Sequence, residues 1–288
     1  MITKASKCPT DMLERVSNFV YENREFAKEN FSLCSSPIEV NTALASSDSW
    51  YVLVTKRPIA LLKLQISEQT ANISQVCVNS DDSLEAMLSS LRQEFRNMRI
   101  AIITVRVPPN NMESLNASGF ERRLSYVKLS RVPAETKMMP ILPLVNATQK
   151  MLPMLSRLMY DAYAKTDHVF SDIESAEKSL RSIMSGFYGT YLSDASFASG
   201  ASQNLVSACL LTMDSPGEAK IAQLFTHPLY RARGLATTEI AVAMNRLVAS
   251  RIGNLTAWMR ESDDVVRRLL AKMDFKEGRR VVEMVARM

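Results

Sequence analysis

One stretch in the second half of the chain decides the expected fold: residues 221–237 read IAQLFTHPLYRARGLAT. Its first residues are mostly apolar and predict a strand that ends at His227. A loop with two arginines and one glycine follows, and Ile240, Met244 and Leu247 then recur at helical spacing. We therefore expect a strand, a basic glycine-containing loop and a helix in immediate succession.

The loop before this helix has the chemistry of an anion site. The first turn of a helix presents N–H groups without intrahelical partners, and it is the positive end of the helix dipole. Gly234 lets a phosphate approach the backbone closely, while Arg231 and Arg233 add positive charge. We expect a pyrophosphate cradle that uses no P-loop lysine. Two solvated arginines at an ordinary helix start are the alternative.

The apolar pattern on both sides of this stretch predicts alternating helices and strands. In the second half, helices are expected over 155–162, 176–187, 240–248 and 265–273, and strands near 190–198, 204–213, 220–226, 255–259 and from 275 onward. In the first half, helices are expected over 13–20, 84–95 and 112–117, and strands over 50–55, 59–66, 71–78, 100–105 and 120–129. Each half therefore has the order helix, strands, strand–helix–strand, short helix, strand.

This shared order predicts that the chain is a duplication of one domain. The central strand–helix–strand unit implies a parallel pair of strands joined by a right-handed crossover. The strands before it form an antiparallel meander. We expect an α/β fold of the α+β kind, in which each half is a mixed, mostly antiparallel sheet with a central parallel pair flanked by helices.

Prolines mark the middle of the chain. Pro133, Pro140 and Pro143 surround a polar stretch, and proline opposes the continuation of both helix and sheet. A chain of 288 residues also suits two domains, since a domain takes ~150 residues. We predict domains over 1–132 and 141–288, joined by a linker over 133–140.

Composition argues against several classes of protein. Hydrophobic residues make up 47% and charged residues 23% of the chain, which is the balance of a soluble globular protein. Because no apolar run approaches the ~20 residues that cross a bilayer, no membrane partner is expected. The net charge of +5 comes from residues 231–288, which hold twelve Lys/Arg and seven Asp/Glu. This modest excess suits a small anionic ligand better than nucleic acid, which calls for a more basic surface.

Histidine and cysteine are too scarce and too scattered for the common metal sites. The two histidines, His168 and His227, lie far apart in sequence, and the four cysteines stand singly. We therefore expect no metal, and we expect buried free thiols. The single cysteines and the absence of a recognisable signal peptide together favour a cytoplasmic location.

With these features in place, the second half resembles the GNAT superfamily of N-acetyltransferases. Arg231, Gly234 and Ala236 match the family's Arg/Gln-x-x-Gly-x-Gly/Ala signature. The resemblance covers about residues 141–288 and is most specific over 219–275.

The resemblance implies acetyl-CoA as the acetyl donor. Its pantetheine arm would lie in the splay between two parallel strands, bound to the backbone of Leu224, Phe225 and Thr226. The pyrophosphate would bind the backbone amides of six consecutive residues: Arg231, Ala232, Arg233, Gly234, Leu235 and Ala236. The Thr237 hydroxyl would be a further donor. A primary amine on a small molecule or a peptide would attack the thioester directly, and a base or water chain would remove its proton.

Two positions depart from the family pattern and leave the catalytic residues open. The tyrosine that many members use as the acid toward the leaving thiolate would fall at Leu270, and a common asparagine falls at Asp263. A glutamate base on the first strand would align near Lys220. Glu218 lies two residues earlier on the same strand face and is therefore one candidate base. His168, between two expected helices, is the other.

The first half resembles the same fold with the cradle removed. Where a phosphate loop would be, Asp81 and Asp82 stand at a helix start, and they would repel a pyrophosphate. The first 118 residues also contain no glycine. We expect tandem acyl-CoA N-acyltransferase-like domains whose N-terminal copy, 1–132, is degenerate. This copy would not bind CoA, and it would pack against the second domain or shape its acceptor cleft.

Other functions stay open at this point. Leu270 and Lys220 would also fit a non-catalytic acyl-CoA-binding or regulatory module, and the C-terminal charge would fit a nucleic-acid-binding protein. Tyr160, Tyr163 and Asp167 are candidates to line the acceptor site. Seventeen methionines suit adaptable packing surfaces, so a homodimer is a further alternative.

Overall fold

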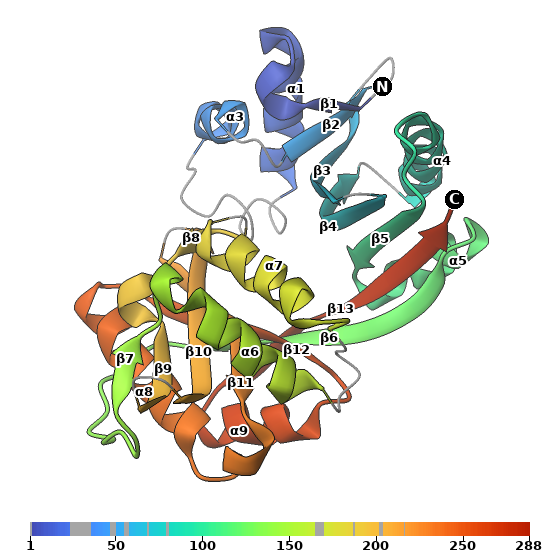
Figure 1. Ribbon diagram of the computed structural model, residues 1–288. Helices are drawn as coiled ribbons and strands as arrows, with labels where there is room; N and C mark the ends of the chain where they lie inside the picture. The colour runs from blue at the N-terminus through green and yellow to red at the C-terminus, as the bar shows by residue number, and fades with distance from the viewer. Residues whose placement is uncertain are drawn as a thin grey trace. The chain divides into compact units, whose positions relative to one another are not determined.

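The computed structural model describes residues 2–23, 36–46, 50–54, 58–67, 69–78, 81–164, 170–186, 188–201, 204–215 and 217–288 (Figure 1). The chain divides into two compact units. Unit 1 comprises residues 1–127, 260–262 and 279–288, and unit 2 comprises residues 128–259 and 263–278. Two strands, β6 (Glu121–Arg131) and β13 (Lys276–Arg287), begin in one unit and end in the other.

Unit 1 consists of a mixed β-sheet and the helices connected to its strands. The strands described in it besides β6 and β13 are β1 (Ile2–Lys4), β2 (Trp50–Val54), β3 (Pro58–Ser67), β4 (Thr70–Val78) and β5 (Ile102–Val107). The helices are α1 (Thr10–Glu22), α3 (Pro37–Ala45), α4 (Asp81–Asn97) and α5 (Met112–Ala117). The strand order is β1-β2-β3-β4-β5-β13. The pair β4/β5 is parallel, and the other neighbours are antiparallel.

The apolar stripe of α4 fills the core of unit 1. Met87, Leu88, Leu91 and Phe95 are each at most 1% exposed and pack in one cluster with side chains of β3, β4 and β5. These residues recur at i, i+1, i+4 and i+8, so one face of the helix is apolar over more than two turns. Burial of such side chains stabilises a fold by about 1.5–3 kcal/mol each.

Unit 2 repeats this plan. Its strands are β7 (Leu144–Asn146), β8 (Thr190–Tyr191), β9 (Phe197–Ala201), β10 (Asn204–Ser215), β11 (Glu218–Thr226) and β12 (Asn254–Arg260). Its helices are α6 (Leu152–Tyr163), α7 (Ile173–Met184), α8 (Leu235–Ala249) and α9 (Asp264–Lys272). The order is β12-β11-β10-β9-β7, with β8 paired to β10. The pair β11/β12 is parallel, and β10/β11 is antiparallel.

Helices cover both faces of the unit 2 sheet. Ala208 and Leu210 of β10 pack in one cluster with α6 and α7. Ser207, on the same strand, instead contacts Glu239 of α8. Because neighbouring residues of a strand point to opposite faces, α6 and α7 lie on one face and α8 lies on the other.

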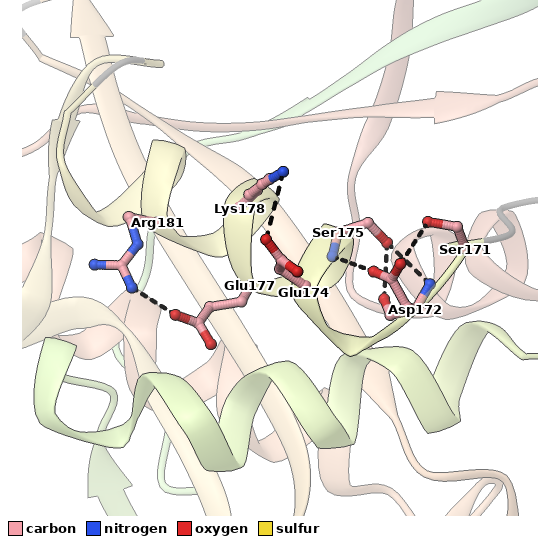
Figure 2. A network of polar contacts seen from close by, with 7 residues as sticks. All are labelled: Ser171, Asp172, Glu174, Ser175, Glu177, Lys178 and Arg181. Atoms are coloured by element: carbon pink, nitrogen blue, oxygen red, sulfur yellow. Dashed lines mark hydrogen bonds and ion pairs between the residues drawn. The ribbon is translucent and has the colours of Figure 1, made fainter.

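The start of α7 is held by its own polar side chains (Figure 2). Asp172 Oδ1 accepts a hydrogen bond from the Ser175 backbone N–H at 2.7 Å, and Ser175 Oγ accepts one from the Asp172 N–H at 3.3 Å. This reciprocal capping satisfies two N–H groups that the helix leaves unpaired, and it lowers the pKa of the Asp172 carboxyl, chiefly through the backbone hydrogen bond. Lys178 pairs with Glu174 one turn further along.

The predicted fold class is confirmed: each unit contains a mixed, mostly antiparallel sheet with a parallel pair, flanked by helices. The short helix expected over 112–117 is α5, with the same limits. Helix α3 and the three-residue strands β1 and β7 were not predicted.

The two units differ from the predicted domains 1–132 and 141–288 in three places, because residues 128–140 belong to unit 2 and residues 260–262 and 279–288 belong to unit 1. The sequence places 276–288 in the second domain, whereas residues 279–288 belong to unit 1. The physical reason is the pairing of β13 with β5, from Val282 opposite Val107 to Arg287 opposite Ile102. The expected linker is also tied down, because Thr136 exchanges two hydrogen bonds with Asn245 of α8.

Candidate functional site

The parallel strands of unit 2 separate before they end. Their pairing runs from Glu218 opposite Asn254 to Ile221 opposite Ala257. Strand β11 nevertheless continues to Thr226, where its other edge is still paired with β10. A strand carries hydrogen-bonding groups on both edges. Beyond Ile221, the edge of β11 on the β12 side is therefore no longer used by the parallel ladder.

The loop after β11 bends back through two residues in the left-handed region. Residues 227–234 separate β11 from α8 and include a short 3-10 helix, Pro228–Tyr230. Ala232 has φ 58° and Gly234 has φ 80°. Glycine adopts this conformation readily, and such turns direct successive N–H groups to the same side of the chain. Gly234 is the N-cap of α8.

Six amides, at the end of this loop and the start of α8, make no hydrogen bond with the described residues. The Arg231 N–H donates to the Pro228 carbonyl and the Thr238 N–H to the Gly234 carbonyl. Between them, the N–H groups of residues 232–237 find no backbone or side-chain acceptor among the described residues. Residues 231–234 are exposed. The start of α8 therefore offers six consecutive donors to a ligand at the positive end of a helix dipole.

The two arginines of the loop have different surroundings. Arg231 Nε donates to the Thr226 carbonyl at 3.2 Å, and Arg231 Nη2 donates to the Ala162 carbonyl at 2.6 Å. This guanidinium joins the loop to the ends of β11 and α6. The Arg233 guanidinium lies 5.0 Å from the centre of the Tyr230 ring. Arg231 thus fixes the loop, and Arg233 supplies exposed positive charge.

A buried carboxyl lies behind the loop. Glu239 of α8 is fully buried, and its carboxyl accepts hydrogen bonds from Ser199 Oγ at 2.5 Å and Ser207 Oγ at 2.9 Å. Ser207 Oγ also lies 2.8 Å from Thr226 Oγ1. Burial raises the pKa of Glu239 to about 8, although the two hydroxyl donors oppose this. The carboxyl is therefore mainly protonated at neutral pH.

The predicted cofactor residues come together at this place. Leu224, Phe225 and Thr226 form the splayed end of β11, and residues 231–237 form the loop and the first turn of α8. Thr237 is partly exposed, and its hydroxyl has no hydrogen-bond partner among the described residues. Binding of a cofactor by these residues stays a prediction, which the geometry makes physically reasonable.

Glu218 stands at the other end of β11. It is in the paired part of the strand, four residues or more from the splayed segment. Its carboxylate is an ion partner of Lys128 at 2.8 Å and accepts hydrogen bonds from Asn254 Nδ2 at 3.1 Å and Thr256 Oγ1 at 3.4 Å. These contacts give the carboxylate a structural role between strands, and we do not propose Glu218 as the base. His168, the other candidate, lies outside the described residues.

Tyr163 contacts the splayed strand directly. Its hydroxyl lies 3.2 Å from Gln223 Oε1 and 3.5 Å from the Leu224 carbonyl oxygen, and its ring meets Phe170 edge-on. From the sequence, Tyr163 is only a candidate for the acceptor site. The missing signal is three-dimensional, since nothing in the local pattern indicates that the end of α6 meets β11.

The two departures from the family pattern have ordinary structural roles. Leu270 is 1% exposed and provides no proton donor. The Asp263 carboxylate caps α9 by accepting a hydrogen bond from the Val266 N–H at 3.1 Å. Neither side chain is arranged for proton transfer.

Unit 1 has the splay without the loop. The parallel pairing of β4 with β5 ends at Ile73 opposite Val105, although β4 continues to Val78. Only residues 79 and 80 separate β4 from α4, whereas eight residues separate β11 from α8. That unit 1 binds no CoA stays a prediction.

Neither a membrane-spanning helix nor a cluster of metal-ligating side chains occurs in the described ranges of the chain.

No family model and no curated protein matches this chain. Solved structures do match it over its whole length. A GCN5-related N-acetyltransferase from Sphaerobacter thermophilus aligns at 11% identity with a TM-score of 0.67, over 100% of this chain and 95% of that one. A tandem GNAT protein from the clavulanic acid biosynthesis pathway aligns at 13% identity with a TM-score of 0.66, over 100% and 97%.

A GCN5-related N-acetyltransferase from Anabaena variabilis aligns at 15% identity with a TM-score of 0.54, over 99% of this chain and 72% of that one. At these identities the likeness is one of fold. The chain has the fold of GNAT acetyltransferases over its full length, in the tandem form.

Proposed function

We propose that the protein is an acetyl-CoA-dependent N-acetyltransferase whose donor site lies in unit 2. The observation that carries this proposal is the run of N–H groups at residues 232–237 that make no hydrogen bond with the described residues, in the loop and helix start that follow a splayed strand. Backbone donors at a helix start are well suited to a diphosphate. The shared fold supports the same cofactor class.

The bound cofactor would extend from the loop into the splay. Its diphosphate would rest on the amides of residues 232–237, beside the exposed Arg233 and the Thr237 hydroxyl. Its pantetheine arm would pair with the backbone of Leu224–Thr226, at the edge of β11 that the parallel ladder with β12 does not use. The thioester would then lie near the splayed end of β11.

The reaction needs two proton movements. A neutral primary amine of a small molecule or peptide attacks the thioester carbonyl carbon and forms a C–N bond. The tetrahedral intermediate then collapses, and the C–S bond breaks. The amine loses one proton to a base, and the thiolate of CoA gains one from an acid. The products are an amide and CoA with a free thiol.

Tyr163 is our candidate for the proton donor. Its hydroxyl lies beside the Leu224 carbonyl, on the segment of β11 that the pantetheine would follow. Leu270, where family members often have their acid, is buried and apolar. His168 stays the candidate base.

A second function has its own support. Because Leu270 and Asp263 serve as a core residue and a helix cap, the protein could bind acyl-CoA without turnover. Such a protein would use the same cradle but would act as a sensor or a regulatory module.

Two measurements separate these functions. Calorimetric titration with acetyl-CoA tests the cradle, with Gly234→Glu as the variant that places a carboxylate among the donors. We expect the wild type to bind acetyl-CoA and the Gly234→Glu variant to bind it much more weakly or not at all. Release of free thiol from acetyl-CoA over a panel of amines tests turnover. Binding without thiol release would favour the non-catalytic function, and absence of binding would contradict both.

A further inference from the structure

A cavity in unit 1 is separate from the loop that we assign to the cofactor. It has a volume of about 550 Å³ and lies between the middle of α4 and the turn after α5. Six residues line it: Leu88, Ser89, Arg92, Ala117, Ser118 and Gly119. All of them belong to unit 1.

Arg92 is the only charged side chain among these lining residues, and its Nε–H finds no acceptor in the part of the chain that the structure describes. Its Nε atom is buried without a hydrogen-bond partner, and no carboxylate or carbonyl of the described residues accepts from its guanidinium. A buried donor that makes no hydrogen bond is costly, and more so when it is charged.

The surroundings hold this guanidinium in place without pairing it. It lies over the ring of Phe120, 5.3 Å from the ring centre. Gly119 has φ 75°, and a Cβ at this position would come within 3.2 Å of Arg92 Nη2. The glycine therefore leaves room for the arginine, and the ring supports one of its flat faces.

The other polar groups of the cavity leave donors for a ligand. Ser89 is exposed, and its hydroxyl makes no hydrogen bond with any described residue. Ser118 Oγ donates to the Ser114 carbonyl, and the Gly119 N–H donates to the Asn116 carbonyl. The available donors are thus the guanidinium fork and one hydroxyl, and none of the six lining residues carries a negative charge.

We propose that this cavity binds a small oxyanion, the carboxylate or phosphate group of a small molecule, through the Arg92 fork. A planar guanidinium pairs with two oxygens of such a group at once, and the Ser89 hydroxyl can donate to the same group. Unit 1 would then have its own ligand although it lacks the loop of unit 2. The inference does not depend on acetyl-CoA binding by unit 2.

The experiment must report on this cavity alone, because an anion can also bind at residues 232–237. We would follow the Arg92 Nε–H and the backbone N–H groups of Ser118, Gly119 and Phe120 by proton–nitrogen NMR. Inorganic phosphate and citrate are added separately to the full-length protein. Arg96→Gln is the matched control, because Arg96 is an exposed arginine one turn later on the same helix.

We expect at least one of the two anions to shift these resonances saturably in the wild type and in Arg96→Gln. In Arg92→Gln, we expect the affinity to fall roughly tenfold or more, since a charge-assisted hydrogen bond is lost. A response to phosphate alone identifies a phosphate ligand, and a response to citrate alone identifies a carboxylate.

Two results would overturn the proposal: resonances that neither anion moves at millimolar concentrations, or an Arg92→Gln variant that titrates as the wild type does. If Arg92→Gln does not fold, Arg92→Lys replaces it. This variant keeps the charge over Phe120 but loses the planar fork, and we expect the same loss of affinity.

Discussion

Glu239 Oε2 accepts a hydrogen bond from Ser207 Oγ at 2.9 Å, inside the core of unit 2. Ser207 in turn contacts Thr226, the last residue of the splayed strand. One buried carboxyl therefore connects helix α8, which begins at the proposed cradle, with the strand that leads to it. Because burial raises the pKa of Glu239 to about 8, the carboxyl that makes this connection is mainly protonated at neutral pH.

The first prediction is a pH dependence of stability that Glu239→Gln removes. The carboxyl titrates near 4.5 in the unfolded chain and at about 8 in the folded one. Between these values the folded state holds the proton and the unfolded state does not, so the free energy of unfolding falls as pH rises. The stabilisation that the protonated Glu239 carboxyl contributes to the folded state is fully present below pH 4.5 and is lost as the pH rises through about 8.

The measurement is chemical denaturation of wild type and Glu239→Gln across this window. The stability of the variant relative to the wild type should increase with pH, by about 1.4 kcal/mol per pH unit at most. All other groups cancel in this difference. A difference that stays constant with pH would show that Glu239 is charged in the fold.

The second prediction concerns Gly234 and uses Gly217 as its control. Both glycines have a left-handed backbone, with φ 80° and 79°. Alanine at either position is therefore expected to cost about 1 kcal/mol of stability through the backbone, and a Cβ at Gly234 would also lie 3.0 Å from Cδ1 of the Ile141 side chain. Nothing lies within 4 Å of a Cβ at Gly217, which is remote from the loop between β11 and α8.

Only Gly234→Ala should weaken acetyl-CoA binding, by about fivefold if the strain of about 1 kcal/mol is relieved by opening the bend. Calorimetry gives the two affinities, and thermal denaturation shows whether the two variants are equally strained. Equal affinities in variants of equal stability would mean that the bend at Gly234 does not form the binding site.

The third prediction separates the two loop arginines. Arg231→Gln loses the hydrogen bonds to the Thr226 and Ala162 carbonyls, so we expect a loss of about 1–2 kcal/mol of stability together with weaker acetyl-CoA binding. Arg233→Gln should change stability by about 0.5 kcal/mol or less. Its weaker binding should approach that of the wild type at high salt, because the effect is one of exposed charge. A loss of stability in Arg233→Gln but not in Arg231→Gln would be incompatible with the hydrogen bonds of Arg231.

The fourth prediction tests Tyr163 as the proton donor. Tyr163→Phe removes the hydroxyl beside Gln223 and Leu224 and keeps the ring. We expect kcat to fall by about 10²-fold or more, as for the loss of a general acid, with little change in the affinity for acetyl-CoA. Tyr191→Phe is the control and should retain kcat, because the Tyr191 hydroxyl donates to the Ala147 carbonyl and belongs to neither proposed site. A Tyr163→Phe enzyme with unchanged kcat at all pH values would exclude this role.

The features that depend on residues close together in the chain could be predicted from the sequence. The basic loop, α8 and the parallel pair follow from one stretch of chain, and α5 follows from its short apolar pattern ended by Gly119. Each of these depends on interactions between residues close in sequence, which apolar periodicity and glycine placement record.

Features that depend on contacts between residues far apart in the chain could not be predicted from the sequence. The return of β13 to β5 joins residues far apart in the chain, and its apolar residues would suit either unit. Glu239 could have been noticed as a carboxylate within the apolar face of α8, but its partners Ser199 and Ser207 are on other strands. The same limit applies to Glu218, whose pairing with Lys128 makes it a structural residue.

The central claim is that the N–H groups of residues 232–237 bind the diphosphate of CoA, and proton–nitrogen NMR tests it most directly. We would titrate the protein with CoA and, separately, with pantetheine, which has no diphosphate. The account predicts saturable downfield shifts of these six amides with CoA and little response to pantetheine, because hydrogen bonding to phosphate requires the charged group. CoA that binds without moving these amides, or that fails to bind, would contradict it.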